Sequence, residues 1–495
     1  MRYRSIRDFI QAADEIGEVK TVHGAALEQD VGCLTELASE MDGPMLLFDR
    51  FEGYPEGFRI ASNLYRNSLR RFALALQLPV DSHPIDLVKL LRERKRKQKP
   101  MPPVFVADGP VLTNQLSGAD VDVERFPAPL WHSEDGGRYI GTGDLLVLRD
   151  PETGWINFGT YRACVQGRQR LSLWIIKYKR GRMIVEKYWA QGKPCPAALV
   201  LGCDPVTFMA GTSQQKYEHA GALHGAPVEV LEAPLTGLPI PAGSEVVFEG
   251  EIPPIDEESA VEGPFGEWPG YYSHSGPECV LRVQHISHQD DPIIHGFPPL
   301  RPVLSWGAEL PGMAVEVWDH LERSGVSDVT GVWGHCHGLM LVIALTQRYP
   351  GHAEQALMTS IGRISGGMYG YVVVVDDDID PSNMRDVLWT LCTRVDPAKA
   401  VQIAHNMLTS DLDPRLSPEQ KAAGDYTMGR MLINACKPFR WRESFPKTNI
   451  FSEAERREVR QRWSGLLQEL EDMVQGRKRS DSLSLPERAG ERVRV

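Results

Sequence analysis

Val246-Val-Phe-Glu-Gly-Glu-Ile252 decides the fold of the middle of the chain. It resembles two earlier runs in its β-branched, aromatic and aliphatic residues, Gly143-Asp-Leu-Leu-Val-Leu-Arg149 and Leu171-Ser-Leu-Trp-Ile-Ile176. Turn residues separate these runs, and such a pattern predicts an antiparallel sheet or barrel. We expect this strand-rich domain to cover residues 104–309, after the Pro-rich segment Lys99-Pro-Met-Pro-Pro103.

The residues before this domain mix helical and strand patterns. Ser5 and Asp8 open an amphipathic helix that ends at Gly17. A strand at Met45-Leu-Leu-Phe48 and a helix from Ser68 to Leu76 follow. The basic run Leu91-Arg-Glu-Arg-Lys-Arg-Lys-Gln-Lys99 is typical of a solvated helix end. Residues 1–103 therefore predict an N-terminal α/β domain.

Apolar strands alternate with helical segments after residue 310. Met340-Leu-Val-Ile-Ala-Leu345 and Tyr371-Val-Val-Val-Val375 are fully apolar, as strands of a doubly wound sheet are. The acidic run Asp376-Asp-Asp-Ile-Asp380 follows the second strand, where it could bind a ligand or cap a helix, and we favour capping. We expect a C-terminal α/β domain at residues 310–452, one long charged helix at 453–475 and a disordered polar tail at 476–495.

Composition narrows the functional classes. The chain has 495 residues, enough for several domains, and a formal net charge of −12, which argues against a nucleic-acid partner held through phosphates. Its eight cysteines are scattered without a C-x-x-C pair, which suits a reducing compartment. We find no apolar signal core near Met1 and no run long enough to span a membrane. We therefore expect a cytoplasmic protein.

Glu262-Gly-Pro-Phe-Gly-Glu267 is the most informative stretch for function. Two carboxylates five positions apart flank a turn that can face both toward one point, and close like charges or burial push their pKa values apart. One carboxyl can then act as an acid and the other as a base. The alternative is a surface turn with two solvated acids. The aromatic residues of Trp268-Pro-Gly-Tyr-Tyr272 favour a pocket instead.

A second candidate site is Asn157-Phe-Gly-Thr-Tyr-Arg162, which follows a strand-like Trp155-Ile156. Gly159 allows the backbone to approach a ligand closely, and Arg162 can bind a carboxylate or phosphate through two parallel hydrogen bonds. Taken alone, such a hexapeptide is more often an ordinary turn followed by a surface arginine than a binding site. Its combination with the acid pair favours a binding site.

These segments together resemble the UbiD-like decarboxylases that use prenylated flavin mononucleotide (FMN). The matching pieces span nearly all of residues 1–470: the Asp8 to Glu18 helix, Asn157 to Arg162, Tyr217-Glu-His-Ala-Gly-Ala-Leu-His-Gly-Ala-Pro-Val228, Glu262 to Glu267, and Asp377 to Trp389. Glu186 to Pro196 and Gln347-Arg-Tyr-Pro-Gly-His352 are most similar to the branch that acts on hydroxylated aromatic acids.

The resemblance implies a fold and a reaction. The fold is an α/β architecture with an N-terminal domain, a central FMN-binding split β-barrel and a C-terminal domain whose last helix supports a homodimer or larger homo-oligomer. The reaction is the reversible, non-oxidative decarboxylation of an aromatic, heteroaromatic or α,β-unsaturated acid through a covalent flavin–substrate adduct. A flavin prenyltransferase would supply the cofactor.

The resemblance also implies residue roles. Glu267 would be the proton donor, Glu262 its partner in an ionic network, and Arg162 the residue that positions the substrate carboxylate. The cofactor-binding residues would be Asn157, Thr160, Tyr161, Arg162, Lys179, Arg180, Gly181 and Glu218. Asn157 and Glu218 would bind Mn²⁺ or another divalent metal at the cofactor phosphate, with K⁺ as a further candidate ion.

One departure from the family pattern affects the metal. Many relatives carry a histidine as third metal ligand at the place of Lys179-Arg180, and no histidine lies in Lys177-Tyr-Lys-Arg-Gly181. Arginine cannot bind a cation, so we expect Lys179, Arg180 and the Gly181 backbone to hold the phosphate directly. Loss of cofactor binding is the rival interpretation.

Two alternatives come from other classes of protein. Gly334-His-Cys-His-Gly338 resembles a nucleophile elbow, and with Asp378 and His405 it would make Cys336 the nucleophile of an α/β-hydrolase. An elbow should open a helix, yet Leu339 to Leu345 is typical of a strand. His335 and His337 could mark a metal site, although packing or pocket-lining roles are more common. The other alternative is a non-catalytic flavin-binding or scaffold subunit of a carboxylase complex. The exact substrate and the reaction direction stay open.

Overall fold

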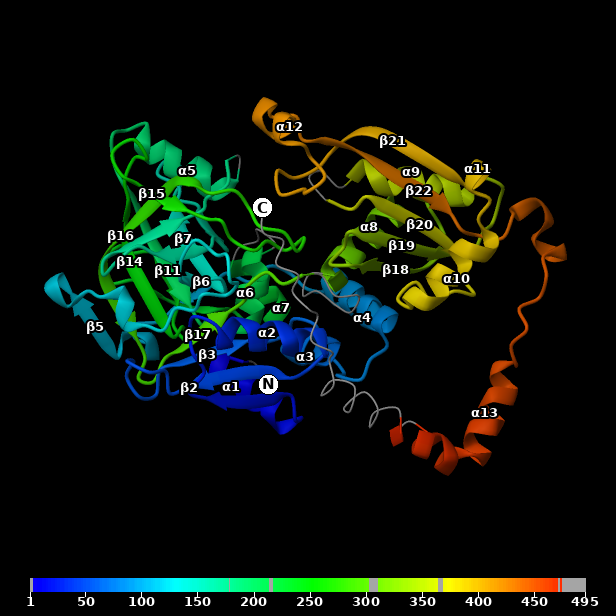
Figure 1. Ribbon diagram of the computed structural model, residues 1–495, viewed down its shortest axis with the longest axis horizontal. Coiled ribbons are helices and arrows are strands. Elements are labelled where there is room, and N and C mark those ends of the chain that lie inside the picture. The colour runs from blue at the N-terminus through cyan, green and yellow to red at the C-terminus, as the bar shows by residue number, and fades with distance from the viewer. Residues whose placement is uncertain are drawn as a thin grey trace, which may run out of the picture. The chain divides into compact units, whose positions relative to one another are not determined.

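The computed structural model describes residues 3–177, 179–212, 217–301, 310–363, 368–470 and 472–473 (Figure 1). Packing divides the chain into two units, residues 1–439 and 440–495. The tail predicted at 476–495 lies outside the described residues. Within them, no helix combines the length and the apolar character that crossing a membrane requires.

The N-terminal region forms a four-stranded mixed sheet with the order β1 (Val19–His23), β2 (Met45–Asp49), β3 (Arg59–Ser62) and β17 (Ile293–Gly296). Its helices are α1 (Ile6–Glu15), α2 (Asp30–Glu40), α3 (Leu69–Ala75) and α4 (Pro84–Lys97). Ser5 and Ser68 cap α1 and α3 through their side chains, so both predicted helices and the predicted strand are confirmed. The fourth strand, β17, comes from more than 200 residues later in the chain.

The basic run forms the last turns of α4, as predicted, but it is not wholly solvated. The Arg92 side chain is buried and pairs with Asp319 and Glu322 of α8 (Leu310–Arg323). Arg96 reaches the same two carboxylates. These acids lie about 220 positions away in sequence, so the run itself gave no sign of them.

The middle of the chain forms a ten-stranded sheet. Its path is β6 (Tyr139–Gly141), β9 (Ala163–Val165), β10 (Arg170–Leu173), β16 (Gly276–His288), β14 (Val246–Ile252), β11 (Cys195–Leu201), β7 (Asp144–Arg149) and β8 (Ile156–Gly159), with β5 (Asn114–Ser117) and β15 (Ser259–Glu262) also paired to β16. All these pairs are antiparallel. Across the described residues the end strands β6 and β8 do not pair, so the sheet stays open. The predicted mixed α/β fold is confirmed.

Smaller elements surround this sheet. A three-stranded sheet has the order β13 (Pro239–Pro241), β12 (Glu229–Glu232) and β4 (Val104–Phe105). The helices are α5 (Arg180–Trp189), α6 (Pro205–Thr212) and α7 (Tyr217–His224), with short 3₁₀ turns η1 (Pro110–Leu112), η2 (Gly118–Asp120) and η3 (Val123–Arg125).

The C-terminal sheet has the order β18 (Val329–His335), β19 (Met340–Leu345), β20 (Tyr371–Asp376), β22 (Thr427–Asn434) and β21 (Val401–Leu408). The β19–β20 and β20–β22 pairs are parallel, and the two outer pairs are antiparallel. The helices are α9 (His352–Arg363), α10 (Met384–Arg394), α11 (Pro397–Ala400) and α12 (Pro418–Ala423), in addition to α8. The predicted apolar strands are β19 and β20.

The prediction that an aspartate of the run 376–380 caps the next helix, α10, is wrong. Asn383 caps this helix, with its side chain accepting the Arg385 amide. Asp376 and Asp378 instead pair with Arg394, and Lys437 also binds Asp378. These carboxylates follow a strand, as predicted, but they form ion pairs with the buried Arg394.

The nucleophile-elbow interpretation is wrong. Cys336 and His337 have φ angles of 49° and 59° and turn β18 directly into its antiparallel neighbour β19. No helix opens after Cys336, because residues 340–345 pair along β18. Burial also raises the pKa of the Cys336 thiol, which opposes thiolate formation.

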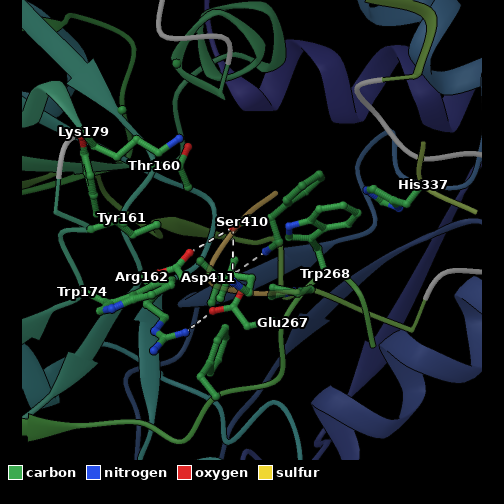
Figure 2. A pocket seen from close by; sticks show the side chains of 18 of the residues that line it. Thr160, Tyr161, Arg162, Trp174, Lys179, Glu267, Trp268, His337, Ser410 and Asp411 are labelled. Carbon is green, nitrogen blue, oxygen red and sulfur yellow. Dashed lines mark hydrogen bonds and ion pairs between the residues drawn. The ribbon is translucent and has the colours of Figure 1, made fainter. Parts of the chain in front are cut away.

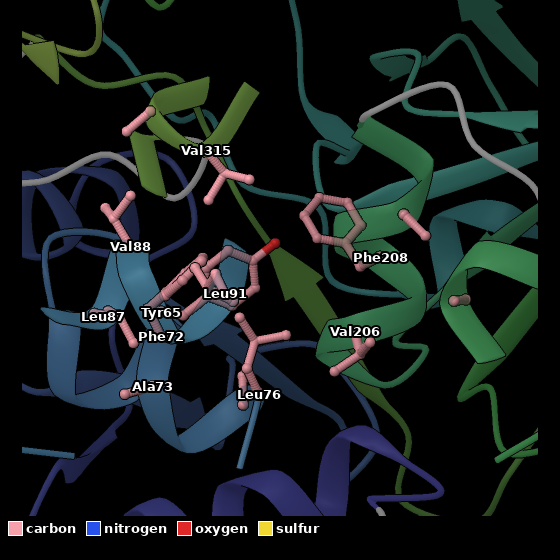
Figure 3. Close-up of a cluster of buried hydrophobic side chains, with 14 of the residues drawn as sticks. Tyr65, Phe72, Ala73, Leu76, Leu87, Val88, Leu91, Val206, Phe208 and Val315 are labelled. Carbon is pink, nitrogen blue, oxygen red and sulfur yellow. The ribbon is translucent and has the colours of Figure 1, made fainter. Parts of the chain in front are cut away.

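An apolar cluster joins elements from three parts of the first unit (Figure 3). Tyr65, Phe72 and Leu91 from the N-terminal region pack with Phe208 of α6 and Val315 of α8. The Tyr65 and Phe208 rings lie 6.3 Å apart. Because Phe208 also lines the cavity described below, this cluster fixes one wall of that cavity.

The second unit includes most of η4 (Phe439–Ser444) and the helix α13 (Glu453–Arg462). Ser452 and Glu455 form a capping box at the start of α13. The predicted single helix over 453–475 is interrupted at Trp463, where φ is −117°, and helix resumes at 464–470. Ser464 and Gly465 follow the break, and both are weaker helix formers than alanine.

Candidate active site

Three buried side chains form one ionic network at the edge of the ten-stranded sheet. Arg162 lies between β8 and β9, Glu262 ends β15, and Glu267 follows in the next loop. The Arg162 Nε and Nη2 atoms each donate to one Glu262 oxygen at 2.6 Å, and Nη1 pairs with Glu267 Oε1. The side chains are only 7%, 1% and 9% exposed, in the order Arg162, Glu262, Glu267. The structure thus brings together the three residues that the sequence singled out for catalysis.

Aromatic and hydroxyl groups hold this network in place. The Tyr139 hydroxyl donates to Glu262 Oε1 at 2.7 Å and accepts the Gly263 amide at 3.2 Å. The Arg162 guanidinium lies 4.1 Å from the centre of the Trp174 ring and 5.2 Å from that of Phe265. Glu262 is therefore fixed from two sides, by an arginine fork and by a tyrosine.

The turn between the two acids depends on glycine. Gly263 has a φ of +80°, and a Cβ there would lie 2.5 Å from the His274 carbonyl oxygen. The backbone conformation and the close neighbour both exclude a side chain. The Gly-Pro-Phe-Gly sequence thus allows the turn that brings both carboxylates to one arginine.

The two acids have different surroundings. The pKa of Glu267 is raised to about 7, mainly by burial; the positive charge of Arg162 lowers this pKa, and the negative charges of Glu262 and Asp411 raise it. Glu262, by contrast, accepts two hydrogen bonds from Arg162 and one from Tyr139. Glu267 can therefore carry a proton at neutral pH beside a carboxylate held by charged donors.

The network opens into a cavity of about 530 Å³ (Figure 2). This volume suits a cofactor or a small ligand. Its aromatic walls include Tyr161, Trp174, Phe208, Phe265, Trp268 and Phe297. Arg162 and Glu267 face the space from one side, while Thr160 and Lys179 lie together elsewhere on its wall.

The side chains of this cavity fit a planar, phosphorylated cofactor. Thr160 Oγ1 is buried without a hydrogen-bond partner, and Lys179 has no carboxylate partner in the described part of the chain. Both groups can donate hydrogen bonds to a phosphate. Arg180, the next residue, packs over Trp155 at 5.4 Å.

Gly181 and Tyr161 form a second close contact beside this anion-binding end. A Cβ on Gly181 would lie 2.3 Å from the Tyr161 hydroxyl oxygen. Burial raises the pKa of Tyr161, while the polar groups of Asn157 and Gly181 lower it. Asn157, Tyr161 and Gly181 thus lie close together at this end of the cavity.

The two predicted metal ligands lie on neighbouring elements. Asn157 is buried on β8, and Glu218 lies in the first turn of α7. The residues next to them, Phe158 and Tyr217, pack with ring centres 4.5 Å apart. Over the described residues, no three His, Cys, Asp or Glu side chains group as metal ligands would.

Several residues of the cavity wall escaped the motif search. Ser410, Asp411 and Leu412 come from the loop after β21, and Arg66 comes from the N-terminal region. Nothing in their sequence context marks them, because loops carry no periodic pattern.

The two histidines at 335 and 337 have different environments. His337 lines the cavity with its ring 5.9 Å from Trp268, and burial lowers its pKa to about 3. His335 is buried, and its Nε2 lies 2.9 Å from the Pro381 carbonyl oxygen. These are the packing and pocket-lining roles that the sequence favoured over a metal site.

Family models match three segments of the chain. They are described as the N-terminal, Rift-related and C-terminal domains of 3-octaprenyl-4-hydroxybenzoate carboxy-lyase, UbiD, and they match residues 10–91, 104–302 and 311–435. The chain belongs to the UbiD family. The UbiD models leave residues 436–495 unmatched, including α13.

Characterised UbiD relatives align along most of the chain. Pyrrole-2-carboxylic acid decarboxylase of Pseudomonas aeruginosa is 31% identical, over 93% of this chain and 97% of its own. A phenolic acid decarboxylase of Streptomyces is 32% identical, over 88% and 93%. Identities of 31% and 32% over most of both chains agree with membership of one family.

Solved UbiD structures share the fold. The vanillic acid decarboxylase of Sedimentibacter hydroxybenzoicus in its open form has a TM-score of 0.82 at 27% identity, covering 95% of this chain and all of that chain. The UbiD-class enzyme HmfF of Pelotomaculum thermopropionicum, solved with FMN, has a TM-score of 0.78 at 26% identity and covers 91% and 98%. The chain therefore has the fold of these UbiD structures.

Proposed function

We propose that this protein decarboxylates an aromatic or heteroaromatic carboxylic acid with prenylated FMN. The observation that carries the proposal is the Arg162–Glu262–Glu267 network at the wall of a cofactor-sized cavity in a UbiD chain. The aromatic walls suit a planar acid. The proposal therefore also includes α,β-unsaturated acids, which are planar at the reacting carbon. The same path run backwards is a carboxylation, so the proposal covers both directions.

The cofactor would be held by Thr160, Tyr161, Arg162, Lys179, Arg180 and Gly181. Asn157 and Glu218 would also take part in its binding. Prenylated FMN, when bound, supplies the electron sink for the electron pair that carbon dioxide leaves behind. Lys179 and Thr160 would bind the phosphate, and the lack of a carboxylate partner for Lys179 and of a hydrogen-bond partner for Thr160 Oγ1 among the described residues supports this assignment. Asn157 and Glu218 offer oxygen ligands for Mn²⁺ or another divalent ion, and K⁺ is a second candidate.

The protein's own residues then perform three tasks. Arg162 orients the substrate carboxylate. Because its guanidinium is fixed, it holds the carboxylate in one orientation for the loss of carbon dioxide. Glu267, protonated near neutral pH, delivers its proton to the carbon that loses carbon dioxide. Glu262 keeps the guanidinium in position through two hydrogen bonds.

A test compares protein produced with and without a flavin prenyltransferase. We expect coloured protein that releases carbon dioxide from a panel of aromatic and heteroaromatic acids only when the prenyltransferase is present. Colourless, inactive protein under both conditions would overturn the proposal. Coloured protein that releases no carbon dioxide would favour a scaffold subunit.

Two variants separate the residue roles. Glu267→Gln should keep the flavin absorption and lose turnover, because the amide preserves the shape but cannot donate the proton. Asn157→Ala should lose the flavin itself. Turnover by Glu267→Gln at the wild-type rate would refute the proton-donor role.

We also propose that the C-terminal segment makes the protein a homodimer or larger homo-oligomer. Val459, Trp463, Leu466, Leu470 and Met473 are all exposed, at alternating spacings of four and three. On each side of the break at Trp463, that spacing is the repeat of a helical face that packs against a partner helix. An evolved form of HmfF, solved with prenylated FMN, is dimeric.

A cytoplasmic location completes the proposal. All eight cysteines are free, including the exposed Cys33 and Cys392. Unpaired, exposed thiols suit a reducing compartment.

A further inference from the structure

A second cavity, of about 450 Å³, adjoins the catalytic loop. Its walls combine residues of the N-terminal region with the loop that carries the acid pair: Glu28, Gln29, Cys33, Glu36, Leu130, Trp131, His132, Ser133, Gly266, Glu267, Gly270, Tyr271, Tyr272, Pro299 and Arg301. Apart from Glu267 and Pro299, these residues do not line the first cavity. Glu267 thus forms part of both walls.

His132 lies against the backbone of the catalytic loop within this second cavity. A Cβ on Gly266 would lie 2.7 Å from His132 Nδ1, so the imidazole packs directly on the residue before Glu267. Its ring centre is 6.0 Å from that of Phe265 and 6.2 Å from that of Tyr272. The contact depends on glycine at position 266, because a side chain there would collide with the His132 imidazole.

Asp135 fastens the histidine to the loop. One carboxylate oxygen accepts the Gly266 amide at 3.1 Å, and the other accepts the His132 amide at 2.9 Å and lies 3.4 Å from His132 Nδ1. The Asp135 side chain is 0% exposed, whereas that of His132 is 17% exposed. A buried carboxylate therefore orients an imidazole whose ring still reaches solvent, an arrangement that suits proton transfer.

The reaction requires a proton from solvent in every cycle. A carboxylate R–COO⁻ and one proton give R–H and carbon dioxide, and Glu267 supplies that proton to the carbon. Glu267 must then regain a proton before it can act again. With cofactor and substrate in the first cavity, the second cavity leaves Glu267 a separate approach for water.

We infer that the second cavity is the proton-entry route to Glu267 and that His132 relays the proton. The inference rests on the proposed function, and it assigns a role to a residue and a cavity outside the ionic network. In each step, His132 takes a proton from solvent and passes it through water in the cavity to the Glu267 carboxylate. The titratable or charged groups that face His132 there are Glu28, Cys33, Glu36, Asp135, Glu267, Tyr271, Tyr272 and Arg301.

The first test replaces the relay. His132→Gln should lower kcat about tenfold, a modest part of the 10²–10⁴ that acid–base groups contribute, and leave KM within about threefold. Imidazole added to the buffer should restore kcat of this variant in proportion to its concentration, and it should not affect the wild type. A kcat within about twofold of wild type, or a loss that imidazole does not change, would overturn the relay.

The second test blocks the route without replacing His132. Cys33 is an exposed thiol on the wall of this cavity. In a Cys336→Ser, Cys392→Ser background, a bulky maleimide on Cys33 should lower kcat, while methyl methanethiosulfonate should lower it less. The further Cys33→Ser variant, treated identically, is the matched control. Equal kcat with the two reagents would contradict a route through this cavity.

A crystal structure supplies a readout that does not depend on activity. We expect ordered waters that connect His132 to the Glu267 carboxyl through the second cavity. A dry or closed path would overturn the inference even in an active enzyme. Inactivity of the wild type towards every acid, with the water path present, would instead overturn the proposed function alone.

Discussion

The pH dependence of turnover follows from the surroundings of Glu267. Burial raises the pKa of this carboxyl from 4.5 to about 7. A general acid works only in its protonated form, so the fraction protonated is about nine-tenths at pH 6 and about one-tenth at pH 8. We expect kcat to be level below pH 6 and to fall about tenfold between pH 6 and pH 8. An ordinary carboxyl would already be about 97% ionised at pH 6.

Replacing Asp411 tests the electrostatic part of this shift. Asp411 raises the pKa of Glu267 through its negative charge, so Asp411→Asn should lower that pKa. A charge pair at a partly solvated wall is worth about 1 to 2 kcal/mol, or roughly one pKa unit. The midpoint of the kcat profile should move from about 7 to about 6, and kcat at pH 7 should fall about fivefold.

The assay is carbon dioxide release at saturating substrate between pH 5 and pH 9, at constant ionic strength. Asp86→Asn is the control, because its carboxylate is 61% exposed on α4 and does not line the cavity. The control should reproduce the wild-type midpoint. A midpoint that stays at its wild-type value or rises in Asp411→Asn would refute the assignment of Glu267 as the titrating acid.

Three further variants test the support of the site. Tyr139→Phe removes two buried hydrogen bonds, one of them to a carboxylate, and should lower the free energy of unfolding by about 2 to 3 kcal/mol in urea titrations, whereas the exposed Tyr271→Phe should not. Lys179→Gln removes the unpaired cation and should weaken FMN about tenfold in fluorescence titrations, with the weakening lost at high salt; an unchanged affinity would remove Lys179 from the phosphate site. Trp463→Glu places a charge in the exposed apolar stripe and should lower the mass measured by sedimentation, and an unchanged mass would show that this stripe is not the oligomer contact.

Local chemistry explains the elements that the sequence predicted. Ser5 and Ser68 mark the first turns of α1 and α3 because their hydroxyls accept amide hydrogens that the helix leaves unpaired. The runs at 246–252 and 371–375 form strands because they are rich in β-branched and aromatic residues, most of which are buried in a sheet. These signals lie within a few residues of the structure they specify.

The acid pair could be predicted for a different reason. Glu262 and Glu267 are close in sequence, and the intervening glycines restrict how the turn can fold. Arg162 is about 100 positions away, and only the family resemblance joined it to the pair before the structure did. Asp411 could not be found, because a loop residue that contributes one charge has no pattern and no motif.

The same limit applies to larger features. Strand β17 completes a sheet begun more than 230 residues earlier, and the second cavity joins α2 to the catalytic loop. Neither contact leaves a trace in local periodicity. The break at Trp463 was also missed, since the charged pattern of residues 453–475 continues through it.

The charges of the network explain why Glu267 should be the acid rather than Glu262. With both carboxylates ionised, the two acids and Arg162 carry a net charge of −1, which would repel a substrate carboxylate. Glu262 holds two Arg162 donors and the Tyr139 hydroxyl, so protonating it would weaken three hydrogen bonds. Protonating Glu267 weakens only its contact with Nη1 and its hydrogen bond from the Trp268 amide, and it makes the Nη1 donor available to the substrate. The proton on Glu267 therefore first permits the substrate carboxylate to bind and is then consumed in turnover. Glu267 thus controls both substrate binding and proton transfer.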